Sequence, residues 1–216
     1  MVSNYFLEAW SMRPRGQVGG SIGALWAVLL IIAPGDVGAA SANWTGGGAD
    51  ALWTNTSNWS ATPVPGLGDT ATFNAAAGSG GAVISLNGIQ TRNITFDSSN
   101  AASYTLGVGA SGNQTFTWGD GANAGAITVN SGVAQNQLIN AAVTLGNTKV
   151  AATYTISNES TADLVLAGNL TGNNVSGVAA IKTVAINGAG NITIGGTVTA
   201  GGASGIQLTK AGSGTL

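Results

Sequence analysis

Acidic side chains are the main groups in this sequence that could do chemistry. Asp50, Asp69 and Asp120 stand in glycine-rich stretches, and Glu159 lies four residues before Asp163. A calcium site needs several oxygen ligands around one point, and glycoside hydrolysis needs two carboxyl groups facing each other across a bond. A four-residue spacing does not bring two carboxylates together in a strand. We therefore predict that Asp50, Asp69 and the stretch around Asp120 form turns.

The residue types that usually carry catalysis are missing. The 216-residue chain has no histidine and no cysteine, so it lacks the commonest general base and any thiolate nucleophile or metal ligand. Its glycine runs include no G-x-x-x-x-G-K-[ST] sequence and precede no predicted helix, so they are not typical of a phosphate loop. We expect no enzyme activity, no cofactor and no bound metal.

Aromatic rings offer one further kind of site. Trp44, Trp53 and Trp59 gather in the segment 43–76, which also contains Pro63 and Pro65. Ring faces of this kind can stack on sugars, so the three tryptophans are candidate ligand contacts. The alternative is that they cover the open first coil of a repeat fold, where apolar groups and strand edges would otherwise be exposed.

Charge is scarce along the whole chain. It has 6 Lys+Arg and 8 Asp+Glu, a net charge of −2, and 44% hydrophobic residues. Disordered chains show the opposite balance of high charge and low hydrophobicity, so we expect an ordered protein. The absence of a basic patch argues against nucleic acid as a partner.

The first 42 residues are typical of a secretory signal peptide. Arg13 and Arg15 precede an apolar run at 22–33, and small residues follow up to Ala42, which is the order of parts in such a peptide. Cleavage is predicted before Asn43, with a site near Ala39 or Ala40 as the second choice. The apolar run is shorter than the roughly 20 residues that a membrane-spanning helix needs, so we expect no transmembrane helix in the mature chain.

Short strands recur through the rest of the chain. Each carries two apolar residues around one small or polar residue, the alternation typical of a strand with one buried face. These triplets lie at 84–86, 94–96, 104–106, 116–118, 127–129, 143–145, 154–156, 164–166, 184–186, 192–194 and 206–208. Their spacing of about ten residues suits a sandwich or a solenoid. Because the strands are short and small residues are abundant between them, we predict an all-β, right-handed parallel β-helix over 77–216, with a β-sandwich as the alternative. Each coil would take roughly 20 residues.

Two segments resemble a known family of secreted proteins. The end of the chain, LTKAGSGTL at 208–216, resembles the opening of the autotransporter-associated β-strand repeat. The segment after residue 42 is similar to the leader of such proteins through Trp44, Trp53, Asn58, Trp59, Pro65, Gly68, Asp69 and Phe73. The resemblance implies a β-helical passenger that is exported through the inner membrane and displayed on the outer-membrane surface or released. Since a solenoid is expected to complete and cap its last coil, we expect the chain to be truncated at Leu216.

The sequence thus favours a structural passenger that mediates surface adhesion or self-association without catalysis. The alternative is a secreted module that binds glycans through its tryptophans. The expected partners are surface glycans or other copies of the chain.

Overall fold

The computed structural model describes residues 40–86, 88–146, 151–172, 180–201 and 205–216, all within the unit Asp36–Leu216. The predicted signal peptide therefore lies almost wholly outside the described residues. Its last residue, Ala42, belongs to the first strand and pairs with Ala71. Cleavage before Asn43 would divide this strand, whereas cleavage near Ala39 or Ala40 would leave it whole.

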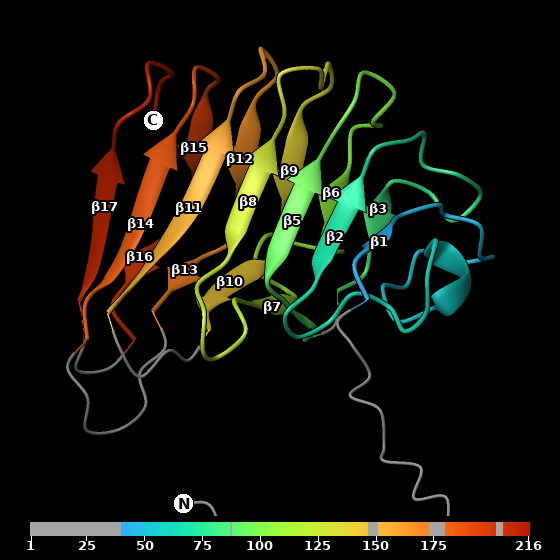
Figure 1. The fold of residues 1–216 in the computed structure, drawn as a ribbon, viewed down its shortest axis with the longest axis horizontal. Helices are drawn as coiled ribbons and strands as arrows, with labels where there is room; N and C mark the ends of the chain where they lie inside the picture. The colour runs from blue at the N-terminus through green and yellow to red at the C-terminus, as the bar shows by residue number, and fades with distance from the viewer. Residues whose placement is uncertain (1–39, 87, 147–150, 173–179, 202–204) are drawn as a thin grey trace, which may run out of the picture. The chain divides into compact units, whose positions relative to one another are not determined.

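Parallel strands form three sheets that the chain visits in turn (Figure 1). The seven-stranded sheet contains β1 (Ala42–Asn43), β2 (Thr70–Phe73), β5 (Asn93–Phe96), β8 (Ala126–Val129), β11 (Ala152–Asn158), β14 (Lys182–Asn187) and β17 (Ile206–Lys210). The second sheet contains β3 (Val83–Ile84), β6 (Thr105–Leu106), β9 (Gln137–Ile139), β12 (Leu164–Leu166) and β15 (Ile192–Ile194). The third contains β4 (Gln90–Thr91), β7 (Thr115–Trp118), β10 (Ala142–Leu145), β13 (Leu170–Thr171) and β16 (Val198–Thr199). A short 3-10 helix, η1 (Thr56–Asn58), precedes them in the N-terminal loop.

Alternation along each strand builds the core. In β2, β5 and β8 of the seven-stranded sheet every second residue is buried, and buried residues stack on one another in register. One such row runs from Ala71 through Ile94, Ile127 and Ile156 to Ile186. Because β-branched side chains have few rotamers and pack well on a pleated surface, this row fixes the alignment of successive coils.

These pairings confirm the predicted parallel β-solenoid. The alternative β-sandwich is wrong, because every pair of named strands is parallel and each strand pairs with the strand one coil away. The expected coil of roughly 20 residues is too short: neighbouring coils are offset by 23 residues at Thr70–Asn93 and by 33 at Asn93–Ala126. Each coil carries three strands rather than two, so it needs more chain.

Polar side chains form a second ladder at the corner before the β3–β15 sheet. Asp163 donates its backbone N–H to Asn136 Oδ1 at 2.8 Å, and Asn191 Nδ2 donates to Asp163 Oδ1 at 3.1 Å. Thr215 continues the ladder by donating its N–H to Asn191 Oδ1 at 3.3 Å. These bonds satisfy backbone groups where the chain turns and the sheet ladder is interrupted.

Helical structure contributes little to the fold. Within the ranges that the structure describes, no helix has the length and hydrophobicity to cross a membrane.

Candidate functional site

The three candidate tryptophans pack together inside the N-terminal coil. Trp44, Trp53 and Trp59 are 0%, 1% and 5% exposed. The rings of Trp53 and Trp59 lie 4.7 Å apart, and those of Trp44 and Trp59 lie 5.1 Å apart, both in edge-to-face arrangements. All three also contact the ring of Phe73, the last residue of β2. This geometry is favourable for aromatic pairs beyond the area they bury.

A buried asparagine holds the loop that carries these rings. Asn58 is fully buried, and its Nδ2 donates to the carbonyl oxygens of Asp50 and Leu52, both at 3.0 Å. Its Oδ1 accepts the N–H of Gly48 at 2.8 Å. The Asp50 carboxylate accepts from Asn55 Nδ2 at 2.9 Å and from the Leu52 N–H at 3.1 Å. These hydrogen bonds, the one from Asn55 foremost, lower the pKa of Asp50.

The burial of the rings bears on both interpretations of the tryptophan segment. The Trp53 indole donates to Pro65 O at 2.8 Å, and the Trp59 indole donates to Trp53 O at 2.7 Å. Their polar edges are therefore occupied within the chain, and their faces lie against other rings. This arrangement is the one expected of a cap or core. An exposed ring face, which stacking on a sugar requires, is not found among these three residues.

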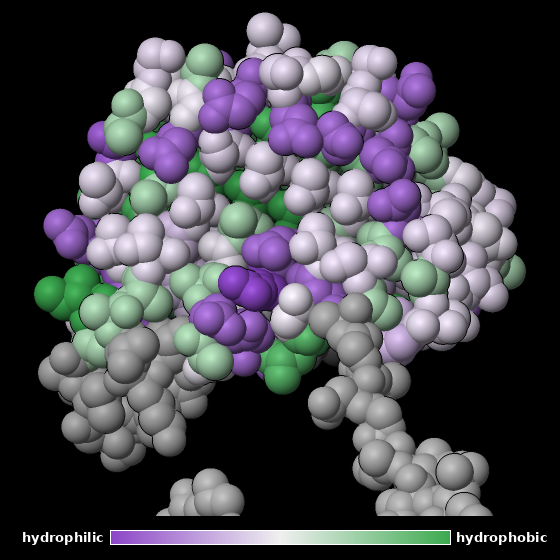
Figure 2. Space-filling model, in the orientation of Figure 1, coloured by the Kyte–Doolittle hydropathy of each residue, from purple (hydrophilic) through white to green (hydrophobic). Residues whose placement is uncertain are grey.

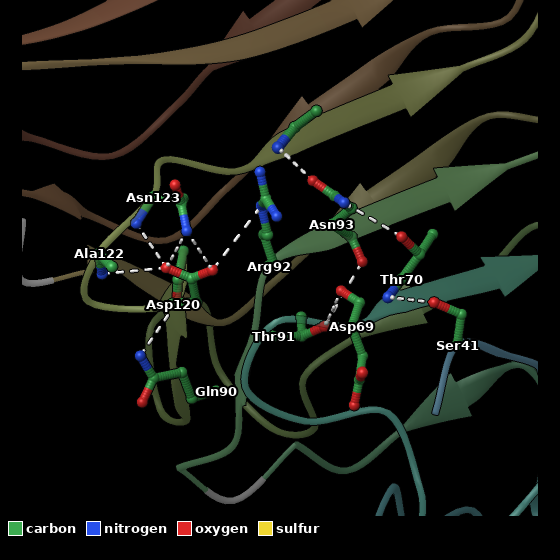
Figure 3. A network of polar contacts seen from close by, with 12 residues as sticks. Ser41, Asp69, Thr70, Gln90, Thr91, Arg92, Asn93, Asp120, Ala122 and Asn123 are labelled. Atoms are coloured by element: carbon green, nitrogen blue, oxygen red, sulfur yellow. Dashed lines mark hydrogen bonds and ion pairs between the residues drawn. The ribbon is translucent and has the colours of Figure 1, made fainter. Parts of the chain in front are cut away.

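The carboxylates predicted to form turns lie at corners of the solenoid (Figure 3). Asp69 precedes β2, and its Oδ2 accepts the N–H of Gly66 at 2.7 Å. Asp120 follows β7, and its Oδ1 accepts the N–H of Ala122 at 3.0 Å. Both are the side-chain-to-backbone bonds typical of turns. Across the part of the chain that the structure describes, no group of three or more acidic side chains is placed to hold a metal ion.

One ion pair joins neighbouring coils. Arg92 Nε lies 3.9 Å from Asp120 Oδ2, at the edge of the network in Figure 3. Partial burial would raise the pKa of Asp120, but hydrogen bonds from Asn123 and Ala122 and the charge of Arg92 outweigh it and lower that pKa. No sequence pattern indicated this pair directly. It can be inferred only once the pairing of Thr91 with Trp118 is known, because that register places the two corners together.

The remaining two carboxylates do not converge on a common partner. Glu159 Oε1 accepts the hydroxyl of Ser157 at 2.7 Å, while Asp163 belongs to the corner ladder through Asn191. The four-residue spacing therefore does not produce a paired carboxylate site in this fold. As a group, these carboxylates accept hydrogen bonds from groups at turns and corners of the chain.

The C-terminal end has a different character. The inward-facing rows of the three sheets end at Leu208, Val198 and Ile194, which continue the rows of Val184, Leu170 and Leu166. Leu208 and Val198 are 41% and 38% exposed, although their positions are buried in earlier coils. A cavity of about 250 Å³ opens there, lined by Thr193, Ile194, Val198, Leu208 and Leu216.

The strands at this end also have unpaired edges. Among the described strands, β16 and β17 pair on one side only, with β13 and β14. The strand β15 pairs with β12, and on its other side the Ile192 N–H donates to Thr215 O at 2.9 Å. An edge strand presents N–H and C=O groups that can pair with another chain. The cavity beside these edges is lined by apolar side chains and the Thr193 hydroxyl, with no acidic or basic side chain.

Comparison with known protein families, with curated proteins and with solved structures finds no match to this chain. The function must therefore be argued from the site itself.

Proposed function

We propose that the chain is an exported structural passenger of the autotransporter type, which acts by self-association or surface adhesion and not by catalysis. The observation that supports this most is the C-terminal end, where an apolar cavity lies beside the edge strands β16 and β17. Export rests on the signal-like order of residues 1–42. The passenger assignment rests on the resemblance of 208–216 to the autotransporter-associated repeat.

A second copy of the chain presents the same strand edges and apolar side chains, so it is complementary to this end. Two copies related by a two-fold axis would bring their β17 strands together in antiparallel pairing. The exposed Leu208 and Val198 side chains of one copy would then face the cavity of the other. Such an interface is self-complementary, and its gain comes from covering apolar surface and satisfying edge hydrogen bonds together.

Sedimentation velocity of the full chain tests this interface. We expect a concentration-dependent dimer, and we expect Leu208→Lys to abolish it because a charge would be buried at the contact. The matched control is Val83→Lys, which places the same charge at a 51% exposed apolar position on β3, the first strand of its sheet. This variant should associate like the unchanged chain.

Two outcomes would contradict the proposal. A monomer at all concentrations in the unchanged chain would remove self-association through this end. Equal association of the Leu208→Lys and Val83→Lys variants would place the contact elsewhere on the surface.

The glycan-binding alternative rests on the tryptophans alone. Since their rings are buried, no specific observation favours it over the structural role.

A further inference from the structure

The outward side of the seven-stranded sheet carries in-register rows of uncharged side chains, of which nine in fifteen bear a hydroxyl, and we call it the hydroxyl face. One row stacks Thr72, Thr95, Thr128 and Ser157 in register, and Asn187 follows. Parallel rows run beside it. They contain Thr70, Asn93, Ala126, Thr155, Ala185 and Thr209 in one, and Thr153, Thr183 and Gln207 in the other. All fifteen outward positions including Asn43 are therefore polar without charge, or alanine.

Charge is kept away from this face. The described charged residues lie at corners and loops, as Asp97 and Glu159 do, or point inward, as Lys182 does. Figure 2 views this side of the molecule, and the surface over β5, β8 and β11 is mostly pale, the colour of intermediate hydropathy. A surface of this kind has no ions to desolvate when it meets an uncharged partner.

The spacing of the rows is set by the sheet. Neighbouring strands lie about 4.8 Å apart, and residues two apart along a strand lie about 6.7 Å apart. Threonine is stiff at χ1, and it presents both a hydroxyl and a methyl group. The face thus holds a central row of fixed hydroxyls and methyls, and alanine and amide side chains interrupt the hydroxyls of the row beside it. Such preorganisation lowers the entropic cost of binding.

A partner that matches this array must itself repeat in two dimensions and carry no charge. A single sugar or peptide would contact one or two of the rows and leave the periodicity unused. The water molecules on the surface of an ice crystal repeat in two dimensions without charge, and each can donate and accept hydrogen bonds. Many weak contacts made at once give strong binding when the geometry lets them form together.

We propose that the hydroxyl face binds ordered water, and specifically the surface of an ice crystal. Thr72, Thr95 and Thr128 form the centre of the contact, with their methyl groups seated in the water lattice and their hydroxyls bonded to it. This function is separate from self-association, because the hydroxyl face lies on the side of the solenoid and the apolar cavity lies at its end.

The test measures partition of the full chain into slowly growing ice, together with inhibition of ice recrystallisation. We expect enrichment of the protein in ice and its loss in Thr128→Tyr, which places a bulky ring in the middle of the face. Tyrosine favours strands, so the fold should be retained. Thr95→Lys is the second variant, and it should also lose ice partition because it introduces a charge.

Matched controls separate this face from the others. Thr144→Tyr makes the same change at an outward position of β10 in the third sheet, and it should partition into ice like the unchanged chain. Leu208→Lys should also keep ice binding, whatever it does to self-association.

Three results would overturn the inference. The first is exclusion of the unchanged chain from ice, as for an ordinary protein. The second is normal partition of both Thr128→Tyr and Thr95→Lys while they are folded. Binding to crystalline cellulose or chitin particles without ice partition would assign the face to a polysaccharide surface instead.

Discussion

The two ends of the described solenoid differ in how far their inward-facing side chains are covered. At the N-terminal end the first coil is covered by β1 and by a loop whose Trp44, Trp53 and Trp59 rings are buried against Phe73. At the C-terminal end Leu208 and Val198 occupy inward positions and yet are about two-fifths exposed. A stack of coils buries its interior rows only where another layer follows. The difference is that the rings at the N-terminal end are covered by other parts of the chain, whereas Leu208 and Val198 have no described strand beyond them.

The largest loss of stability is expected at the N-terminal end. Trp53→Ala should lower the free energy of unfolding by about 3–5 kcal/mol, because it removes a buried ring and leaves a cavity. Leu208→Ala at the open end should cost about 1 kcal/mol, since this side chain is already partly in water. Chemical denaturation of both variants measures the contrast. Equal losses would mean that the two ends are buried alike.

The hydrogen-bond networks at the two ends should differ in the same sense. Asn58→Ala would leave the Gly48 N–H and the carbonyl oxygens of Asp50 and Leu52 without their partner in a buried loop, at a cost of about 3 kcal/mol. Asn191→Ala removes two bonds at an exposed corner, where water can replace them, and should cost about 0.5 kcal/mol. The denaturation midpoints of the two variants measure this difference in stability. A larger loss of stability in Asn191→Ala than in Asn58→Ala would contradict the prediction.

The stability at alkaline pH should depend on Tyr104, in the N-terminal half of the solenoid. Burial raises the pKa of Tyr104 to about 12, and its hydroxyl donates to Ala75 O at 2.8 Å. The unfolded tyrosine ionises near pH 10, so the folded state holds more protons between pH 10 and 12. Stability is then full below pH 10 and falls as the pH rises above it. Tyr104→Phe should reduce this alkaline fall in a pH series of melting temperatures; an unchanged slope would contradict it.

Acid should have the smallest effect. The pKa of Asp50 is lowered in the folded state by its bonds to Asn55 and Leu52. Its contribution is therefore present above about pH 4 and is lost as the pH falls through the folded-state pKa. Because the carboxylate is exposed, the change should be slight. Asp50→Asn should flatten the acid side of the stability profile, and a steeper acid loss in this variant would show that the charge destabilises the loop.

The strand pattern was readable from the sequence because it depends on alternation. All eleven predicted triplets coincide with or overlap strands in the structure. Six described strands lie outside these triplets, namely β1, β2, β4, β9, β13 and β16. The strand β9 was missed because it begins with Gln137, which is polar but fully buried. Its Nε2 donates to Ala102 O at 3.0 Å and its Oε1 accepts the N–H of Tyr104 at 3.1 Å. A buried amide can be satisfied by the neighbouring coil, and local alternation does not reveal this.

Properties that depend on stacking could not be predicted in this way. Lys182 lies at an inward position and is fully buried, and this burial lowers its pKa, although its sequence context looks like the exposed start of a strand. The hydroxyl rows also depend on register, since Thr95 and Thr128 become neighbours only through a coil offset of 33 residues. The side-chain types of each strand can be read from the sequence. Which strands become neighbours depends on the lengths of the coils, which the sequence pattern did not predict.

Hydrogen exchange of the full chain at two protein concentrations tests the central claim most directly. The account predicts that the amides of β17 exchange more slowly at the higher concentration, because a second copy covers that edge. The amides of β2, at the N-terminal end, should exchange at the same rate in both samples. Exchange in β17 that is independent of concentration, or protection that appears first in β2, would contradict the claim that the C-terminal end is the one that binds.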